Sequence, residues 1–168
     1  NADIDIPQDL RVIRYKTAKL LEAAARLGAI LSGAPAEVEE GLARYGMHLG
    51  TAFQLVDDVL DYSGDEDATG KHLGDDLAEG KPTLPLIHAM QQGSAAQSAC
   101  VRHAIEEGGR NAFPEVMAAI RATGALDETR RHAEAEAKLA LEVIAMLPAS
   151  TYKDSLVQLP PFAVARDF

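Results

Sequence analysis

Three aspartates, Asp57, Asp58 and Asp61, lie close together in the sequence, just after Gln54. In a helix with about 3.6 residues per turn, these four side chains share a face roughly 100° wide. Like charges repel at that spacing, and on an otherwise apolar helix they are costly unless a cation neutralises them. Oxygen ligands without a nearby His or Cys favour a hard ion, Mg2+ above all, which often shares its coordination shell with substrate phosphates. An isolated triplet of this kind is more often a solvated acidic face, so the neighbouring sequence decides the interpretation.

Lysines that could bind phosphate flank the triplet in the sequence. Downstream, a segment rich in Gly and Asp carries Lys71 and Lys81, and glycine allows a phosphate to approach the backbone closely. An acidic site beside such lysines is typical of a metal-bridged diphosphate. Upstream, Lys16 and Thr17 lie about 100° apart on a predicted helix and could face one cavity. A helical lysine is usually a surface residue, so this pair carries no weight alone.

The other reactive side chains show no catalytic or metal-binding arrangement. Cys100 lacks an accompanying His and Asn pattern, which favours a role in helix packing. The histidines share no metal-ligand spacing, so we interpret all of them as structural or surface residues and exclude histidine catalysis. They are His48, His72, His88, His103 and His132.

Length and composition limit the possible functions. The 168 residues are 47% hydrophobic, which is enough to bury one core and predicts a single domain over residues 1–168. A formal charge of −10 and the lack of a Lys/Arg-rich block exclude a nucleic-acid-binding surface. The single cysteine fits a reducing compartment, so we expect a cytoplasmic protein. We expect neither a signal peptide nor a membrane span, and because the first residue is not Met, missing upstream residues remain an open alternative.

Apolar residues recur at helical spacing along the chain, and no period-two run predicts a strand, so the predicted fold class is all-α. We expect a first helix over about residues 9–32, with Asp9 as its N-cap and Gly33 as its left-handed exit. A second helix, over about residues 35–62, would place the aspartate triplet near its C-terminal end. Its apolar stripe predicts burial on one side.

The remaining sequence alternates a long loop with shorter helices. Residues 63–81 contain no helical stripe and are too long for a simple connection, which predicts a functional loop. We expect Pro160 and Pro161 to break or kink the last helix. The shorter helices are predicted over residues 83–92, 95–107, 112–123, 127–146 and 152–166.

The order and spacing of these motifs resemble those of the trans-polyprenyl diphosphate synthases. The resemblance covers most of residues 10 to 90, and the helical remainder is compatible with it. The sequence around Phe53 and Lys81 is most similar to the bacterial long-chain branch, which makes quinone side chains of the octaprenyl type. The matching segments are Tyr15-Lys16-Thr17-Ala18, Leu21-Glu22-Ala23-Ala24, Leu49-Gly50-Thr51-Ala52-Phe53-Gln54-Leu55, Asp57-Asp58-Val59-Leu60-Asp61-Tyr62, Gly70-Lys71, Gly74-Asp75-Asp76 and Glu79-Gly80-Lys81-Pro82-Thr83-Leu84-Pro85-Leu86.

The resemblance implies a helical bundle of the isoprenoid synthase type and a prenyltransferase that condenses isopentenyl diphosphate with an allylic prenyl diphosphate. In this family, magnesium ions bridge aspartates to the allylic diphosphate and stabilise the charge of the leaving group. Asp57 and Asp61 would be direct metal ligands, and Asp58 would bind directly or lie behind them.

The resemblance also implies roles for residues outside the triplet. Lys16 and Lys71 would hold the allylic diphosphate, and Lys81 would add to the positive rim. Thr17 and Gln54 would line the reacting carbons. Phe53 would help to position the isopentenyl group, whereas we assign no catalytic role to Arg166.

One part of the family pattern is absent from this sequence. Family members carry a first DDxxD motif followed by an Arg pair, preceded by basic residues that hold isopentenyl diphosphate. We therefore expect the chain to be the C-terminal half of a larger synthase, inactive alone and a homodimer when full length. Two alternatives stay open: a non-catalytic isoprenoid-synthase-like subunit that binds a partner chain, and a shorter-chain farnesyl or geranylgeranyl diphosphate synthase. The intact motifs favour an enzyme, because a scaffold has no need of a repulsive aspartate triplet.

Overall fold

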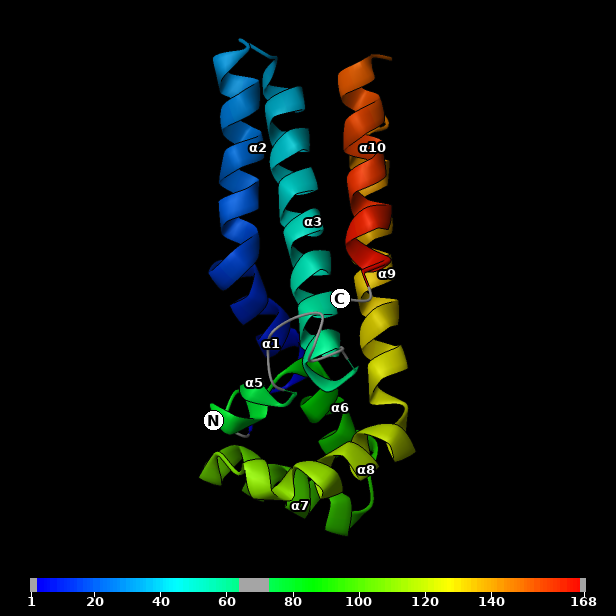
Figure 1. The fold of residues 1–168 in the computed structure, drawn as a ribbon. Coiled ribbons are helices and arrows are strands. Elements are labelled where there is room, and N and C mark those ends of the chain that lie inside the picture. Colours follow the sequence, from blue (N-terminus) through cyan, green and yellow to red (C-terminus); the bar gives the residue numbers. More distant parts are fainter. Residues whose placement is uncertain (1–2, 64–72, 167–168) are drawn as a thin grey trace. The chain divides into compact units, whose positions relative to one another are not determined.

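The structure is a computed structural model that describes residues 3–63 and 73–166 (Figure 1). The described residues form helices and turns without a strand, which confirms the all-α prediction. They divide into two compact units, and each is described by itself. Among the described residues, unit 1 comprises 3–9, 57–63 and 73–131, and unit 2 comprises 10–56 and 132–166. The single domain expected from the composition stays a prediction.

The helix bounds lie close to those expected from the sequence. Helices α7 and α8 begin and end within a residue of the predicted positions. The helical elements are α1 (Ile6–Ile13), the π-helical turn η1 (Arg14–Ala18), α2 (Lys19–Leu31), α3 (Ala36–Ser63), α5 (Asp75–Ala78), α6 (Leu84–Gln92), α7 (Ala95–Glu107), the 3-10 turn η2 (Arg110–Ala112), α8 (Phe113–Thr123), α9 (Ala125–Ile144) and α10 (Thr151–Val164).

The first helix begins earlier than predicted. The backbone N–H of Gln8 donates to Asp5 Oδ1 at 2.8 Å, and the N–H of Asp5 donates to Gln8 Oε1 at 3.1 Å. This reciprocal pair satisfies the free donors at the helix start, as a capping box does. The prediction of Asp9 as N-cap is therefore wrong, since Asp9 lies inside α1 and is buried. The left-handed exit at Gly33 is confirmed by its φ of 67°.

In unit 2, α2 and α3 run side by side in very close contact (Figure 1). A Cβ at Gly46 would lie 2.3 Å from the Leu21 carbonyl oxygen, and one at Gly50 would lie 2.7 Å from the Ala18 Cα. Glycine at these two α3 positions therefore allows the backbone of α3 to contact the backbone at Ala18 and Leu21. On another side of α3, Tyr45 packs with Ala140 and Ile144 of α9 in a buried cluster, which fixes α3 between two sets of helices.

The paired prolines near the end of unit 2 lie inside α10 and do not break it. Of the predicted break or kink, the break is therefore wrong, and the kink stays a prediction. Pro160 has no N–H to donate to the carbonyl of Leu156, four residues earlier. The Tyr45 hydroxyl donates to that carbonyl instead, at 2.7 Å. The hydroxyl of Tyr45, on α3, thus supplies the hydrogen bond that Pro160 cannot make, and the helix continues.

In unit 1, helices α6, α7 and α8 pack around a core that also holds the end of α3. Tyr62, in the last turn of α3, is 2% exposed and stacks on Phe113 of α8 with ring centroids 6.4 Å apart. Leu77 of α5 is fully buried in the same core. These contacts fix both the end of the aspartate helix and the short helix that follows it.

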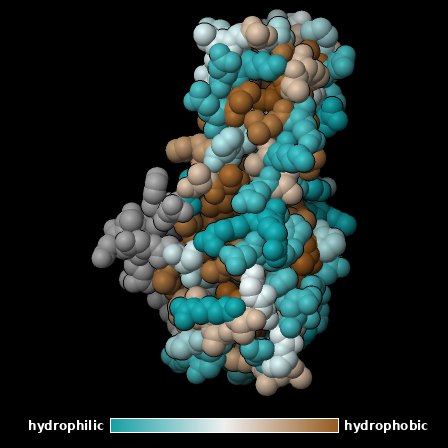
Figure 2. All heavy atoms as spheres, turned by 90° about the vertical axis from the view of Figure 1, so that its right-hand side faces the viewer, coloured by the Kyte–Doolittle hydropathy of each residue, from teal (hydrophilic) through white to brown (hydrophobic). Residues whose placement is uncertain are grey.

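The surface of unit 2 carries large apolar side chains. In the part of Figure 2 that shows α9 and α10, hydrophobic side chains lie among hydrophilic ones. On α10, Phe162 is 65% exposed, and on α2, Leu20 and Leu31 are 74% and 86% exposed. Within the described part of the chain, no helix has the length and apolar character needed to cross a membrane.

Candidate active site

The aspartate triplet lies in the last turns of α3, as predicted. Asp58 is only 3% exposed, whereas Asp57 and Asp61 are partly accessible to solvent. Because Asp57 and Asp61 are one helical turn apart, they lie on one face of α3. Asp57 and Asp61 are therefore the members of the triplet that an ion arriving from solvent can reach.

Asp61 organises the loop that follows the aspartate helix. Its Oδ1 accepts the backbone N–H of Asp75 at 3.2 Å, and its Oδ2 accepts that of Asp76 at 3.1 Å. The Asp61 carbonyl also accepts the N–H of Gly74 at 2.8 Å. The carboxylate of the third aspartate thereby fixes the start of α5, which sequence analysis did not foresee.

The surroundings of Asp61 disfavour its charge. Burial raises the pKa of Asp61 to about 6, and the negative charge of Asp76 adds to the rise. The N–H donors of Asp76 and Asp75 act in the opposite direction but do not cancel it. A nearby cation would favour the ionised carboxylate.

Lys81 lies at the end of this loop and is held by acidic neighbours. Its Nζ lies 2.5 Å from Glu79 Oε2 and 3.0 Å from Asp76 Oδ1. The hydrogen bonds that Lys81 donates to Glu79 and then to Asp76 raise the pKa of Lys81 above its usual range. Lys81 is therefore a fixed positive charge next to the carboxylates of unit 1. The other predicted loop lysine, Lys71, lies outside the described residues.

The second group of predicted residues lies in unit 2. Lys16 and Thr17 belong to the π-helical turn η1. The Thr17 hydroxyl donates to Gln54 Oε1 of α3 at 2.8 Å, so these two residues, from separate sequence motifs, lie in contact. Lys16 is exposed, so its ammonium group is accessible to an anion.

Phe53, next to Gln54 on α3, is 39% exposed and has a cationic neighbour. The guanidinium of Arg166 lies 3.8 Å from the centroid of the Phe53 ring and donates to the Phe53 carbonyl at 3.1 Å. Such cation–π contacts favour a fixed ring orientation. Sequence analysis missed this contact because 113 residues separate the partners and Arg166 lies outside the recognised motifs.

By themselves, the carboxylates of Asp57 and Asp61 could supply only part of a magnesium site. Among residues 3–63 and 73–166, no three His, Cys, Asp or Glu side chains lie close enough together to hold a metal ion. Mg2+ keeps several waters and usually takes one or two carboxylates together with phosphate oxygens. The donor chemistry of Asp57 and Asp61 fits that mode of binding. The predicted metal site stays a prediction.

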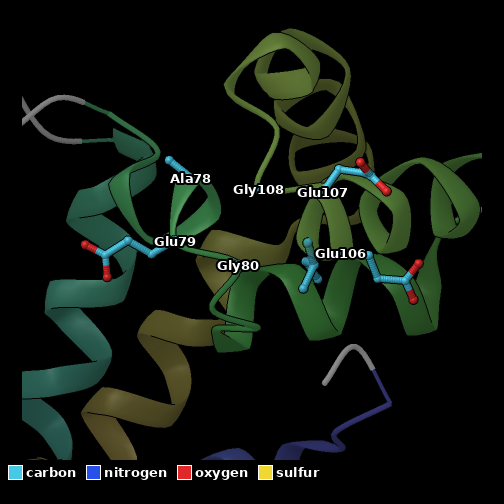
Figure 3. Close-up of a pocket in the computed structure, with 7 residues that line it drawn as sticks. Ala78, Glu79, Gly80, Glu106, Glu107 and Gly108 are labelled. Atoms are coloured by element: carbon cyan, nitrogen blue, oxygen red, sulfur yellow. The ribbon is translucent and has the colours of Figure 1, made fainter.

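A separate acidic pocket of about 570 Å³ lies between the end of α7 and the loop after α5. Its lining includes Glu79, Glu106 and Glu107, but their side chains point in different directions (Figure 3). Glu79 is already paired with Lys81. The pocket therefore offers no converging set of ligands, and we assign it no function.

Comparison with known proteins identifies the family. The model of the polyprenyl synthetase family matches residues 1–122. The chain is 49% identical to octaprenyl diphosphate synthase from Escherichia coli (strain K12), over 98% of this chain and 52% of that protein. It is 45% identical to all-trans-nonaprenyl-diphosphate synthase (geranyl-diphosphate specific) from Rhodobacter capsulatus, over 94% of this chain and 48% of that protein.

A solved structure supports the same assignment. The polyprenyl synthase from Caulobacter crescentus CB15, complexed with calcium and isoprenyl diphosphate, superposes with a TM-score of 0.93 at 36% identity. The match covers 100% of this chain and 52% of that structure. The chain thus spans about half the length of the relatives it matches. The sequence motifs, the helical fold and the family match agree, and the chain belongs to the polyprenyl synthetase family.

Proposed function

We propose that this chain is part of a trans-polyprenyl diphosphate synthase that condenses isopentenyl diphosphate with an allylic prenyl diphosphate into a long-chain, octaprenyl-like product for a quinone side chain. The observation that supports this most is the arrangement around Asp61. Its carboxylate fixes the loop that carries Lys81, so acidic and basic groups are held together in unit 1. The similarity to octaprenyl and nonaprenyl diphosphate synthases supports the long-chain product.

The proposed reaction breaks the bond between the allylic carbon and the diphosphate oxygen. The electron pair leaves with the diphosphate, the double bond of isopentenyl diphosphate forms the new carbon–carbon bond, and a proton is then lost from the resulting cation. The difficult step is charge separation, so groups fixed beforehand around the leaving group supply most of the catalysis.

Asp57 and Asp61 are the proposed ligands of Mg2+, with Asp58 behind them because it is buried. When bound, the ion supplies positive charge to the diphosphate oxygens. The calcium in the Caulobacter synthase is a hard cation of the same preference for oxygen ligands. Magnesium is the ion we propose for this chain, on the chemistry of its carboxylates.

The remaining side chains bind and orient the substrates. Lys16, exposed on η1, and Lys71 would hold the allylic diphosphate, while Lys81 would add positive charge beside the aspartates. Thr17 and Gln54 are joined by a hydrogen bond, which restricts both side chains where they would line the reacting carbons. Phe53, stacked under Arg166, would position the isopentenyl group.

A chimera tests this function directly. The 168 residues would replace the segment they match in octaprenyl diphosphate synthase from E. coli, and the product would be analysed after reaction of farnesyl diphosphate with labelled isopentenyl diphosphate and Mg2+. We expect elongated product, and light scattering of the chimera should give the mass of a homodimer. A folded chimera without turnover would favour the alternative of a non-catalytic subunit. Short products would favour the farnesyl or geranylgeranyl alternative.

The cytoplasmic location stays a prediction.

A further inference from the structure

Lys16, which is predicted to hold the allylic diphosphate, and its neighbour Thr17 lie on an unusual helical turn. Residues Arg14–Ala18 form a π-helical turn between α1 and α2. Such turns are rare inside α-helices because they contain an extra residue, and they occur often at functional sites. The extra residue changes the direction in which Lys16 and Thr17 point relative to a regular helix. A turn of this kind needs contacts from neighbouring elements to hold it.

Two of those contacts come from α3. A Cβ at Gly50 would lie 2.7 Å from Ala18 Cα, so the backbones of α3 and the turn touch there. The Thr17 hydroxyl donates to Gln54 Oε1, one helical turn further along α3. These contacts hold the C-terminal part of the turn but leave its beginning unfixed.

A buried carboxylate holds the beginning of the turn. Glu136 of α9 is 8% exposed, and its Oε1 accepts from Arg14 Nη2 at 3.2 Å. Its Oε2 lies 2.6 Å from His48 Nδ1 on α3. Arg14 is the first residue of the turn, so Glu136 links that end of it to α3 through His48.

The charge of Glu136 is retained despite its burial. Burial raises its pKa, but the hydrogen bond and charge of His48, followed by those of Arg14, act more strongly and lower the pKa below its usual value. An ionised carboxylate accepts stronger hydrogen bonds than a neutral one. The network Arg14–Glu136–His48 is therefore a charged anchor rather than a chance surface contact. None of its members belongs to the motifs that identify the family in this sequence.

We propose that Glu136 is a positioning residue for the allylic diphosphate: through Arg14 and His48 it holds the π-helical turn in the geometry that presents Lys16. The inference rests on the proposed role of Lys16 in binding that diphosphate. Glu136 itself touches no substrate. Its removal lets the turn relax toward a regular helix, which moves Lys16 while leaving its charge in place.

A double-mutant cycle tests the inference on the 168-residue chain. Glu136→Gln, Lys16→Ala and the double variant would be titrated with farnesyl diphosphate in the presence of Mg2+, with binding followed by calorimetry. We expect each single change to weaken binding roughly tenfold and the double variant to bind no more weakly than Lys16→Ala, because residues that act through one another are not additive. The matched control is Glu134→Gln, the same change at an exposed position of α9, which should bind as the wild type does.

A second variant separates positioning from loss of folding. Arg14→Gln removes the other end of the network at a side chain that is 43% exposed, and it should weaken binding without adding to the effect of Glu136→Gln. Wild-type affinity in Glu136→Gln, or an equal loss in the wild-type and Lys16→Ala backgrounds, would overturn the inference and leave the proposed function standing. Wild-type affinity in Lys16→Ala, or no Mg2+-dependent binding by the wild-type chain, would contradict the proposed function itself.

Discussion

Individual carboxylates in this chain have different structural roles because their surroundings differ. Asp61 accepts two backbone N–H groups and fixes a loop, whereas Glu136 accepts from Arg14 and lies beside His48, and fixes a helical turn. Asp9 is also buried, but its Oδ2 has no hydrogen-bond partner among the described residues. Only Glu136 has its pKa lowered by its partners, whereas burial raises the pKa of Asp61 and of Asp9.

We expect Asp57→Ala in the chimera to lower turnover by roughly 100-fold or more, because it removes a proposed ligand of the charge-stabilising ion. The stability of the metal-free protein should change by less than about 1 kcal/mol, since one of several neighbouring negative charges is lost. Steady-state rates and thermal melts without metal check both statements. Asp127→Ala, at an exposed aspartate of α9, is the control and should keep its activity. Turnover near the wild-type rate would show that Asp57 is not a ligand of the proposed metal ion.

Asp9 should make the protein less stable as the pH rises. Burial raises its pKa to about 7, so between the pKa of about 4 in the unfolded chain and about 7 the folded state binds more protons than the unfolded state. Stability is then highest at the acidic end of this range and levels off above pH 7. Asp9→Asn should therefore be more stable than the wild type at pH 8, by roughly 1–3 kcal/mol.

Urea denaturation at pH 5 and pH 8 measures this difference. The gap between Asp9→Asn and the wild type should be larger at pH 8 than at pH 5. Asp154→Asn, at an exposed aspartate, should follow the wild-type pH dependence. A constant gap between Asp9→Asn and the wild type at both pH values would show that Asp9 does not titrate in this range.

At the scale of the elements, contacts between helices decide what local sequence leaves open. The π-helical turn η1 is contacted by α3 and α9, and in α10 the carbonyl that Pro160 leaves without a donor accepts from Tyr45 of α3. Burial of Tyr45 also raises its pKa to about 12, so its hydroxyl keeps its proton and stays a donor at neutral pH. Each of these features is local in the chain but is stabilised by a distant residue.

The hydrogen bond from Tyr45 should stabilise the fold only when Pro160 leaves the Leu156 carbonyl without a backbone donor. We expect Tyr45→Phe to cost about 1–2 kcal/mol of unfolding free energy in the wild type, because the Leu156 carbonyl loses its partner. In a Pro160→Ala background the new N–H can bond that carbonyl, so the same change should cost clearly less. Urea denaturation of the four proteins gives the coupling energy. An equal cost in both backgrounds would mean that the hydroxyl does not replace the missing bond.

At the scale of the whole molecule, the chain is about half the length of the relatives it matches and exposes much apolar surface. Leu20, Leu27 and Leu31 are 74%, 55% and 86% exposed on α2. Their spacing of seven and four residues places them on one face of the helix. An apolar face of this kind favours association with other protein surface.

We expect the 168-residue chain by itself to bind diphosphate weakly, to self-associate and to form no elongated product. The proposed metal-binding face, acting alone, would leave the diphosphate insufficiently neutralised and poorly oriented for ionisation. An assay with labelled isopentenyl diphosphate, farnesyl diphosphate and Mg2+ tests activity, and sedimentation tests association. Leu27→Ser should reduce association, whereas Ser155→Ala, on another helix, should not. Elongated product from the purified chain would show that a second face is unnecessary.

The order of the residues was enough to predict the all-α class, the helix that carries Asp57, Asp58 and Asp61, and the family. These follow from periodicity and from motifs in which the informative residues are neighbours in the chain, as with Gly33 at the end of α2. Such signals are local, because helix spacing and left-handed exits depend on the nearest few residues.

Which distant residues meet follows from the packing of the helices. The Leu156 carbonyl of α10 accepts from Tyr45 where Pro160 has no donor, and Glu136 joins Arg14 to His48 across 122 and 88 residues of sequence. The sequence could not show these contacts, because a carboxylate or a hydroxyl has the same local pattern whether it faces water or a partner. Which side chains are buried, and which partners they have, depends on the packing between helices. The Arg14–Glu136–His48 network that contacts the π-helical turn is a product of this packing.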